Sequence, residues 1–165
     1  MTKPAHTLRR RSSQFDSLEQ EVYLNVWRTY DRLRAVEDEL FGSFELTPQQ
    51  YNVLRLLKAA HPESLPTLIL AERLVSRAPD ITRMLDKLEE RGLLTRTRPA
   101  ENRRLVQVGI TEQGIALLAE IRVPLEACHS KQLGHLTAAQ LRELASLLQL
   151  ARDPHEPDGS SWRGS

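Results

Sequence analysis

Apolar side chains of this 165-residue chain take up a regular pattern at about residue 15. They recur at steps of three and four residues as far as residue 41, which is the period of an amphipathic α-helix. The stripe consists of Phe15, Leu18, Val22, Val26, Leu33, Val36 and Leu40. Outside it lie four more apolar side chains, Leu24, Trp27, Tyr30 and Phe41. A helix with more than one apolar face needs two partners, so we expect it to pack on its own domain and on a second copy of the chain.

The same period predicts three short helices between residues 47 and 91. The first begins at Thr-Pro-Gln-Gln (47–50), which combines a cap, a proline at the first helical position and a capping box, and it ends near residues 61–62. The second covers Thr67–Leu74. The third follows a turn at residues 76–79 and runs to about Arg91, where Gly92 stops it. Its buried stripe is Ile81, Met84, Leu85 and Leu88.

The period changes after Gly92. Residues 94–98 and 106–110 alternate between apolar and polar side chains, and a charged, turn-like segment (99–104) separates them, which predicts a β-hairpin. Thr111 then caps a helix over residues 112–123, and a second capping box at residues 137–140 opens a leucine-rich helix that ends near residue 151. Pro124 predicts a kink or a break between the two.

Length and composition fit a single soluble globular domain, with 40% hydrophobic and 27% charged residues. No apolar run approaches the ~20 residues that cross a bilayer, and no secretory signal is evident. A single cysteine, Cys128, excludes a scaffold held together by internal disulfides. We therefore expect a cytoplasmic protein, without a membrane partner, that has a flexible basic start (1–13), one domain (14–152) and a flexible tail (153–165).

The charge is unevenly placed along the chain. The whole sequence carries a formal charge of only +1, but nine basic residues face six acidic ones between Glu72 and Arg104, a local surplus of three. The basic residues are Arg73, Arg77, Arg83, Lys87, Arg91, Arg96, Arg98, Arg103 and Arg104. This surplus coincides with the third short helix and the hairpin, so it points to an anionic partner for these two elements.

Three short helices followed directly by a hairpin form a winged helix-turn-helix. The major groove of B-DNA, about 12 Å wide, admits one helix, and a recognition helix meets base edges near its start. Arginine at a hairpin tip suits the narrow minor groove, because its charge is permanent and its hydration weak. The predicted fold class is therefore mainly α with a small β-hairpin wing, and double-stranded DNA is the expected partner.

Two segments, LTPQQYNVLRLL and ITRMLDKLEERGLLTRTRPAENRRLVQVGITEQG, closely resemble the multiple antibiotic resistance regulator (MarR) family of bacterial transcription factors. The resemblance covers about residues 15–150. It implies a DNA-binding core (about 47–111), two dimerisation helices (about 15–42 and 112–151) and a homodimeric repressor on a pseudo-palindromic operator. Recognition helices of such a dimer lie about 34–36 Å apart. The resemblance also implies a response to a small aromatic or phenolic effector, or to an oxidant. The Trp27/Tyr30 region and the helix around Pro124 could line its cleft or belong to the core, and we favour the core.

The resemblance also indicates which residues meet DNA. The base-contacting positions of the family fall on Arg77, Pro79, Asp80 and Arg83, and phosphate contacts fall on Thr82 and Lys87. In the wing the family pattern Asp-x-Arg reads Asn102-Arg103-Arg104, so the arginine matches and an amide replaces the acid. That amide still accepts a hydrogen bond but without the charge-assisted component. Asp80 has two interpretations: it accepts from a cytosine amino group, or it stabilises the positive end of its own helix, which we favour.

Other classes of function have less support. The five histidines are scattered, and no Gly-rich phosphate loop, H-E-x-x-H or G-x-S-x-G occurs, so we expect neither an enzyme nor a bound metal or cofactor. Cys128 could be a redox switch, but it has few cationic neighbours in the sequence and we favour a structural thiol. The alternative to DNA binding is a winged helix that contacts another protein. Added salt separates the two, since it weakens DNA binding steeply.

Overall fold

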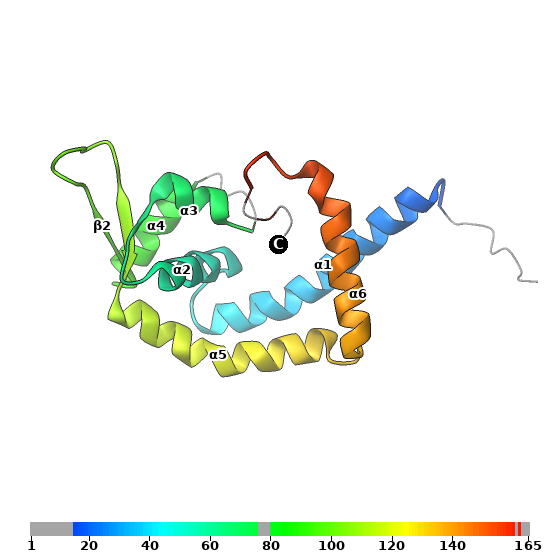
Figure 1. Ribbon diagram of the computed structural model, residues 1–165. Helices are drawn as coiled ribbons and strands as arrows, with labels where there is room; N and C mark the ends of the chain where they lie inside the picture. The colour runs from blue at the N-terminus through cyan, green and yellow to red at the C-terminus, as the bar shows by residue number, and fades with distance from the viewer. Residues whose placement is uncertain (1–14, 76–79, 161, 163–165) are drawn as a thin grey trace, which may run out of the picture. The chain divides into compact units, whose positions relative to one another are not determined.

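The computed structural model of the chain describes residues 15–75, 80–160 and 162 (Figure 1). Within these residues the chain forms six α-helices, one short 3-10 helix and three β-strands. In chain order they are α1 (Leu18–Ser43), α2 (Pro48–Ala60), β1 (Leu65–Pro66), α3 (Thr67–Arg73), α4 (Ile81–Glu90), β2 (Leu94–Thr97), β3 (Gln107–Ile110), α5 (Glu112–Leu133), α6 (Ala138–Arg152) and the 3-10 helix η1 (Asp153–His155). The mainly helical fold with a small hairpin is confirmed. The predictions for residues 1–13 and 76–79 lie outside the described residues.

The chain divides into two units after Ala35, and helix α1 spans the division. The first unit contributes the beginning of α1, which confirms the helix predicted from residue 15. Trp27 and Tyr30 are each 60% exposed, so placing them in the core of the single chain was wrong. Their exposed apolar neighbours on α1 are Leu18, Val22, Tyr23, Leu24 and Val26. The ring centroids of Tyr23 and Trp27 are 6.2 Å apart.

The core of the second unit lies where α2, α3, α4 and α5 meet the sheet. Its fully buried side chains come from each of these elements: Val53, Leu54, Leu57, Leu70, Leu85, Leu88, Leu94, Val108 and Ile121. Each buried aliphatic side chain contributes roughly 1.5–3 kcal/mol relative to an exposed one. The apolar stripes of the three short helices therefore hold these helices together against the hairpin.

The sheet has three antiparallel strands in the order β1-β3-β2. Strands β2 and β3 form the predicted hairpin, with Leu94 opposite Ile110 and Thr97 opposite Gln107. The sequence did not predict β1, which pairs Leu65 with Val108 on the other edge of β3. This pairing joins the start of α3 to the root of the wing.

Local signals set several helix ends. Both predicted capping boxes are present, Thr47 with Gln50 and Thr137 with Gln140, and each threonine accepts the backbone N–H of its glutamine. Gly92 follows α4 with φ +68°, a left-handed conformation that suits glycine at the end of a helix. These features confirm the predicted starts of α2 and α6 and the predicted stop after α4.

Pro124 was predicted to kink or break the helix, and the break was wrong, because α5 continues from Glu112 to Leu133 without interruption (Figure 1). Proline removes one backbone donor from the helix ladder. Buried side chains on both sides of it, Ile121, Leu125 and Cys128, anchor the two halves of α5. Their packing outweighs the loss of one hydrogen bond, so the helix does not end.

Helix α6 exposes most of its leucines, and none of its residues is buried. Exposed fractions range from 36% for Leu141 to 70% for Leu150. Part of the segment predicted to be a flexible tail has regular structure, since η1 follows α6 directly. Arg152 pairs with Glu156 at 3.2 Å and lies over the ring of Trp162, 5.7 Å from its centroid. These contacts fold the described end of the chain back on α6.

Candidate nucleic-acid interface

Helix α4 has one packed face and one open face. Leu85 and Leu88 are buried in the core, with Ile81 and Met84 half-buried beside them. The side chains predicted to meet DNA, Thr82, Arg83 and Lys87, are all exposed. The 3.6-residue period separates the two sets, so the helix can keep its packing while its open face meets a ligand.

Asp80 caps helix α4. Its Oδ1 accepts the backbone N–H of Arg83 at 3.0 Å, and Asp80 is the N-cap residue. A carboxylate at this position also favours the positive end of the helix by about 0.3–1 kcal/mol. Of the two interpretations of Asp80 given by the sequence, these contacts support stabilisation of its own helix rather than recognition of cytosine. Arg77 and Pro79, the two predicted base contacts before Asp80, lie outside the described residues.

The wing tip is a tight turn organised by Asn102. Its backbone N–H donates to the Pro99 carbonyl at 3.1 Å, and its carbonyl accepts from Leu105 at 3.1 Å. The side-chain Oδ1 of Asn102 accepts the backbone N–H of Arg104 at 3.2 Å. The amide thus supplies an acceptor where the family pattern has an acid. Arg103 and Arg104 are exposed on this turn.

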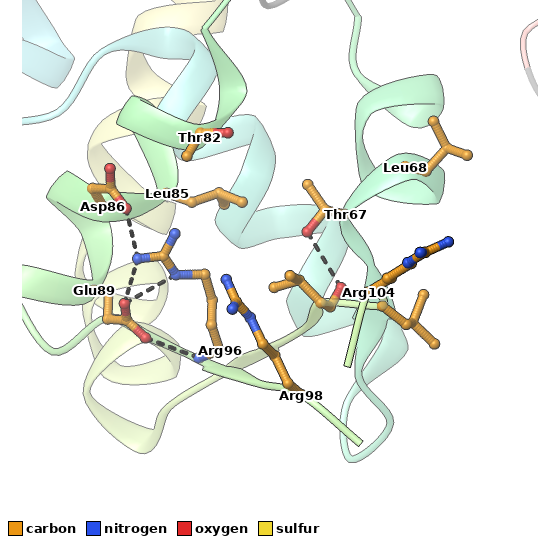
Figure 2. Close-up of a pocket in the computed structure, with 11 residues that line it drawn as sticks. Thr67, Leu68, Thr82, Leu85, Asp86, Glu89, Arg96, Arg98 and Arg104 are labelled. Atoms are coloured by element: carbon orange, nitrogen blue, oxygen red, sulfur yellow. Dashed lines mark hydrogen bonds and ion pairs between the residues drawn. The ribbon is translucent and has the colours of Figure 1, made fainter. Parts of the chain in front are cut away.

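A groove of about 880 Å³ runs between α3, α4 and the wing (Figure 2). Leu85, Leu105 and Val106 contribute apolar lining. Arg98 and Arg104 lie on its wing side, and Thr82 lies on the side of α4. Thr67 stands at the start of α3, where its hydroxyl donates to the Val106 carbonyl at 3.3 Å. The arginines on its wing side allow this groove to hold a polyanion.

Arg96 forms the shortest polar contacts among the described groove residues, at 2.6 Å. Its Nε and Nη2 donate to Glu89 Oε2 at 2.9 and 2.6 Å, and its Nη2 lies 2.6 Å from Asp86 Oδ1 (Figure 2). The backbone N–H of Arg96 donates to Glu89 Oε1 at 3.0 Å. Hydrogen bonds from Arg96 hold the pKa of the Glu89 carboxyl below its usual range.

Arg91 is also used inside the protein. At the end of α4, its guanidinium donates to the backbone carbonyls of Glu45, at 2.5 Å, and Phe44, at 3.2 Å. The count of charges along the sequence included Arg91 and Arg96 and could not distinguish them from the exposed basic residues. Asp86 and Glu89 are three residues apart and therefore share one face of the helix. This spacing in the sequence could have indicated that an arginine pairs with them inside the protein. Nothing local in the sequence marks the carbonyl contacts of Arg91.

The histidines and the cysteine were the other candidates for chemistry. Over the described ranges, 15–75, 80–160 and 162, no cluster of three metal-binding side chains occurs. None of the helices in these ranges has the apolar length that a bilayer requires. His129 is 56% exposed and lies 3.6 Å from Glu37. Cys128 is buried, and burial raises the pKa of its thiol, with the charge of Glu37 adding to the effect. A thiol in these surroundings resists ionisation, which supports the structural role.

A capped helix and a hairpin that border one cationic groove define a winged helix-turn-helix protein. The MarR family model matches residues 46–106 of the chain. The crystal structure of a MarR transcription factor from Planctomyces limnophilus shares 55% sequence identity, covers 83% of this chain and 99% of its own, and superposes with a TM-score of 0.67. The chain belongs to the MarR family and is a MarR-family transcription regulator.

More distant relatives agree with this assignment. The HTH-type transcriptional repressor MdtR of Bacillus subtilis is 26% identical over 143 residues, which are 87% of this chain and 91% of the repressor. The MepR protein in the crystal structure of the S. aureus MepR–DNA complex is 21% identical and covers 78% of this chain and 95% of its own, with a TM-score of 0.69. At that identity the likeness is one of fold.

Proposed function

We propose that this protein is a repressor that binds a pseudo-palindromic DNA operator as a homodimer and is released by a small aromatic or phenolic effector. The observation that carries DNA binding is the groove between α4 and the wing, which Arg98 and Arg104 line, together with further cations exposed on the same two elements. In the part of the chain that the structure describes, no side-chain ion pair engages these cations, which are Arg83, Lys87, Arg98, Arg103 and Arg104. The MepR–DNA complex supports DNA as the partner of this fold.

Each element has its own part in this proposal. Helix α4 enters the major groove with Thr82 and Arg83, and Arg77 and Pro79 precede it as further proposed contacts. Lys87 meets a phosphate one turn later. Arg104 enters the minor groove from the wing tip that Asn102 organises, with Arg103 beside it. Asp80 acts through the cap it gives to α4.

The dimer in this proposal uses the apolar side chains that α1 and α6 leave exposed. Leucines on α6 and aromatic side chains on α1 are exposed, and exposed groups of large apolar side chains mark surfaces that bind another protein. Deletion of residues 137–165 should abolish the dimer in analytical ultracentrifugation. A well-folded monomer that still binds the operator tightly would contradict this part of the proposal.

DNA binding is tested with two arginine variants and a matched control. Genomic DNA fragments bound by the protein identify the operator, and affinities are then measured on operator and scrambled duplexes at several salt concentrations. Arg83→Ala should cost about 1–3 kcal/mol on the operator and relax base preference. Arg104→Ala should weaken binding to both duplexes and reduce the salt slope by about one unit. Lys58→Ala removes a charge from the exposed side of α2, away from the groove, and should change neither.

The same measurements separate the alternatives. If both arginine variants bind like wild type, α4 and the wing do not meet DNA in the proposed way. If no duplex binds with a steep salt dependence, the winged helix serves a protein partner instead. Repression and effector release are tested together, by a reporter behind the selected operator and a screen of aromatic acids and phenols for compounds that dissociate the complex.

A further inference from the structure

Arg96 joins the wing to helix α4 at one wall of the groove. It lies in β2, opposite Val108 of β3, and its side chain turns toward Asp86 and Glu89 (Figure 2). These two carboxylates stand on successive turns of the same face of α4. A single side chain of the hairpin thus reaches both, at the level of the helix where the open face carries Arg83 and Lys87.

The contact fixes backbone as well as side chain. Glu89 receives three hydrogen bonds from one residue, two from the guanidinium and one from the backbone N–H of Arg96. The planar guanidinium binds carboxylates in a fixed geometry, which an ammonium group does not. Because the backbone of β2 is held at the same point, the root of the wing cannot rotate against α4 without breaking all three bonds.

Charge alone does not explain these carboxylates. Asp86 and Glu89 line the groove that the proposed function assigns to DNA, and negative charge there repels phosphate. A groove built only to attract DNA would bind more tightly without them. Any benefit they bring to DNA binding must therefore come from the position they give to the wing.

We propose that Arg96 is a positioning residue that holds the wing at a fixed angle to α4, so that Arg83 and Arg104 engage the operator cooperatively. This inference rests on the proposed function and adds to it the residue that couples the two DNA-reading elements. Arg96 acts through Asp86 and Glu89, and it is not itself one of the proposed DNA contacts.

The first test uses a substitution for which charge and geometry predict opposite results. Glu89→Gln keeps the size of the side chain and removes one negative charge from the groove. If only the charge of Glu89 mattered, the variant should bind DNA more tightly than wild type. By position, operator affinity should fall about 2- to 30-fold, the range of mutations that act on coupling, while scrambled duplex binds as well as before or better. Glu90→Gln makes the same charge change on the next residue of α4, which is exposed and outside the groove lining, and operator binding should not weaken.

The second variant keeps the charge and changes the geometry. Arg96→Lys replaces the guanidinium group, which contacts two carboxylates, with a single ammonium group. Operator affinity should fall as it does for Glu89→Gln, with the salt slope unchanged, because no phosphate contact is lost. Wild-type affinity in this variant would show that Arg96 acts by charge alone and would overturn the inference. Thermal unfolding of each variant confirms that it is folded at the temperature of the binding assay.

Coupling itself is measured by a double-mutant cycle. In the wild-type background, the fold-losses of Arg83→Ala and Arg104→Ala should combine non-additively on the operator. In the Glu89→Gln background the two losses should become additive. A merely stabilising ion pair would leave the cycle unchanged, and that result overturns the inference. If the wild type binds no DNA, the proposed function fails as well; if it binds and Glu89→Gln matches Glu90→Gln, only the inference fails.

Discussion

Replacing Gly114 with alanine should destabilise the protein, although alanine is the better helix former. Gly114 is buried in the first turn of α5, next to Leu93 and Ile110 at the root of the wing. A Cβ at this position would collide with the backbone carbonyl oxygen of Leu93 and lie 2.8 Å from Cγ1 of Ile110. The Leu93 carbonyl cannot retreat freely, because it accepts the backbone N–H of Thr111 at 3.2 Å and the Leu93 side chain is buried.

The size of the effect follows from two opposing contributions. Overpacking of a well-packed site costs about 1–3 kcal/mol. Alanine returns up to about 1 kcal/mol of helix propensity. Because the clashing atom belongs to the backbone, we take the upper part of the overpacking range, about 2–3 kcal/mol. The net loss should then be about 1–2 kcal/mol, which lowers the melting temperature of a chain of this length by about 2–8 °C.

Urea and thermal unfolding, followed by circular dichroism, measure this loss directly. Gly42→Ala is the matched control, because it makes the same substitution near the end of α1, where a Cβ would meet nothing within 4 Å. That variant should be as stable as wild type, or more stable by up to about 1 kcal/mol. If Gly114→Ala melts at or above the wild-type temperature, the close approach of α5 to Leu93 does not limit this site.

Three further predictions concern a carboxylate, a thiol and the core. Because Arg96 lowers the pKa of Glu89, the ionised carboxylate stabilises the folded protein above the ordinary glutamate pKa of about 4.3, and this contribution is lost as the pH falls through the lowered value. The excess urea stability of wild type over Glu89→Gln should therefore be full at neutral pH and shrink in acid; a constant difference contradicts the linkage. Cys128→Ser should leave DNA binding nearly unchanged and the native thiol should react slowly with iodoacetamide, since burial raises its pKa; release of the wild type alone by peroxide would show a redox role. Leu54→Ala should cost about 2–5 kcal/mol in urea unfolding, because this fully buried side chain leaves a cavity, and a loss below 1 kcal/mol would mean that the core collapses around it.

Helix boundaries were predictable where the signals that set them are local. The capping boxes at Thr47 and Thr137 need only four residues each, and the structure contains both. Strand β1 was not predictable from pattern, because two residues carry no period and their partner on β3 is some forty positions away. Pro124 shows the opposite limit. A local rule predicted a kink or a break, and packing on both sides of the proline keeps the helix unbroken.

The candidate site was predictable in outline but not in its internal contacts. Exposed positions such as Arg83 and Arg104 follow from helix period and from the place of the hairpin tip. Counting charges could not separate them from Arg91 and Arg96, whose partners are backbone carbonyls and carboxylates supplied by folding. The role of Gly114 was likewise hidden, since the sequence shows a glycine and only the structure shows the carbonyl that approaches it.

The division of α4 into a packed face and an open face has a consequence for how binding sites diversify. Thr82, Arg83 and Lys87 are exposed, while Leu85 and Leu88 hold the helix in the core. If α4 reads DNA as proposed, substitutions at the three exposed positions would change the preferred DNA sequence at little cost in folding, usually within about 0.5 kcal/mol each. A library randomised at these positions should consist mostly of folded proteins, so that selection can act on the choice of operator almost independently of stability. Proteins that share this fold could in this way come to bind many different operator sequences.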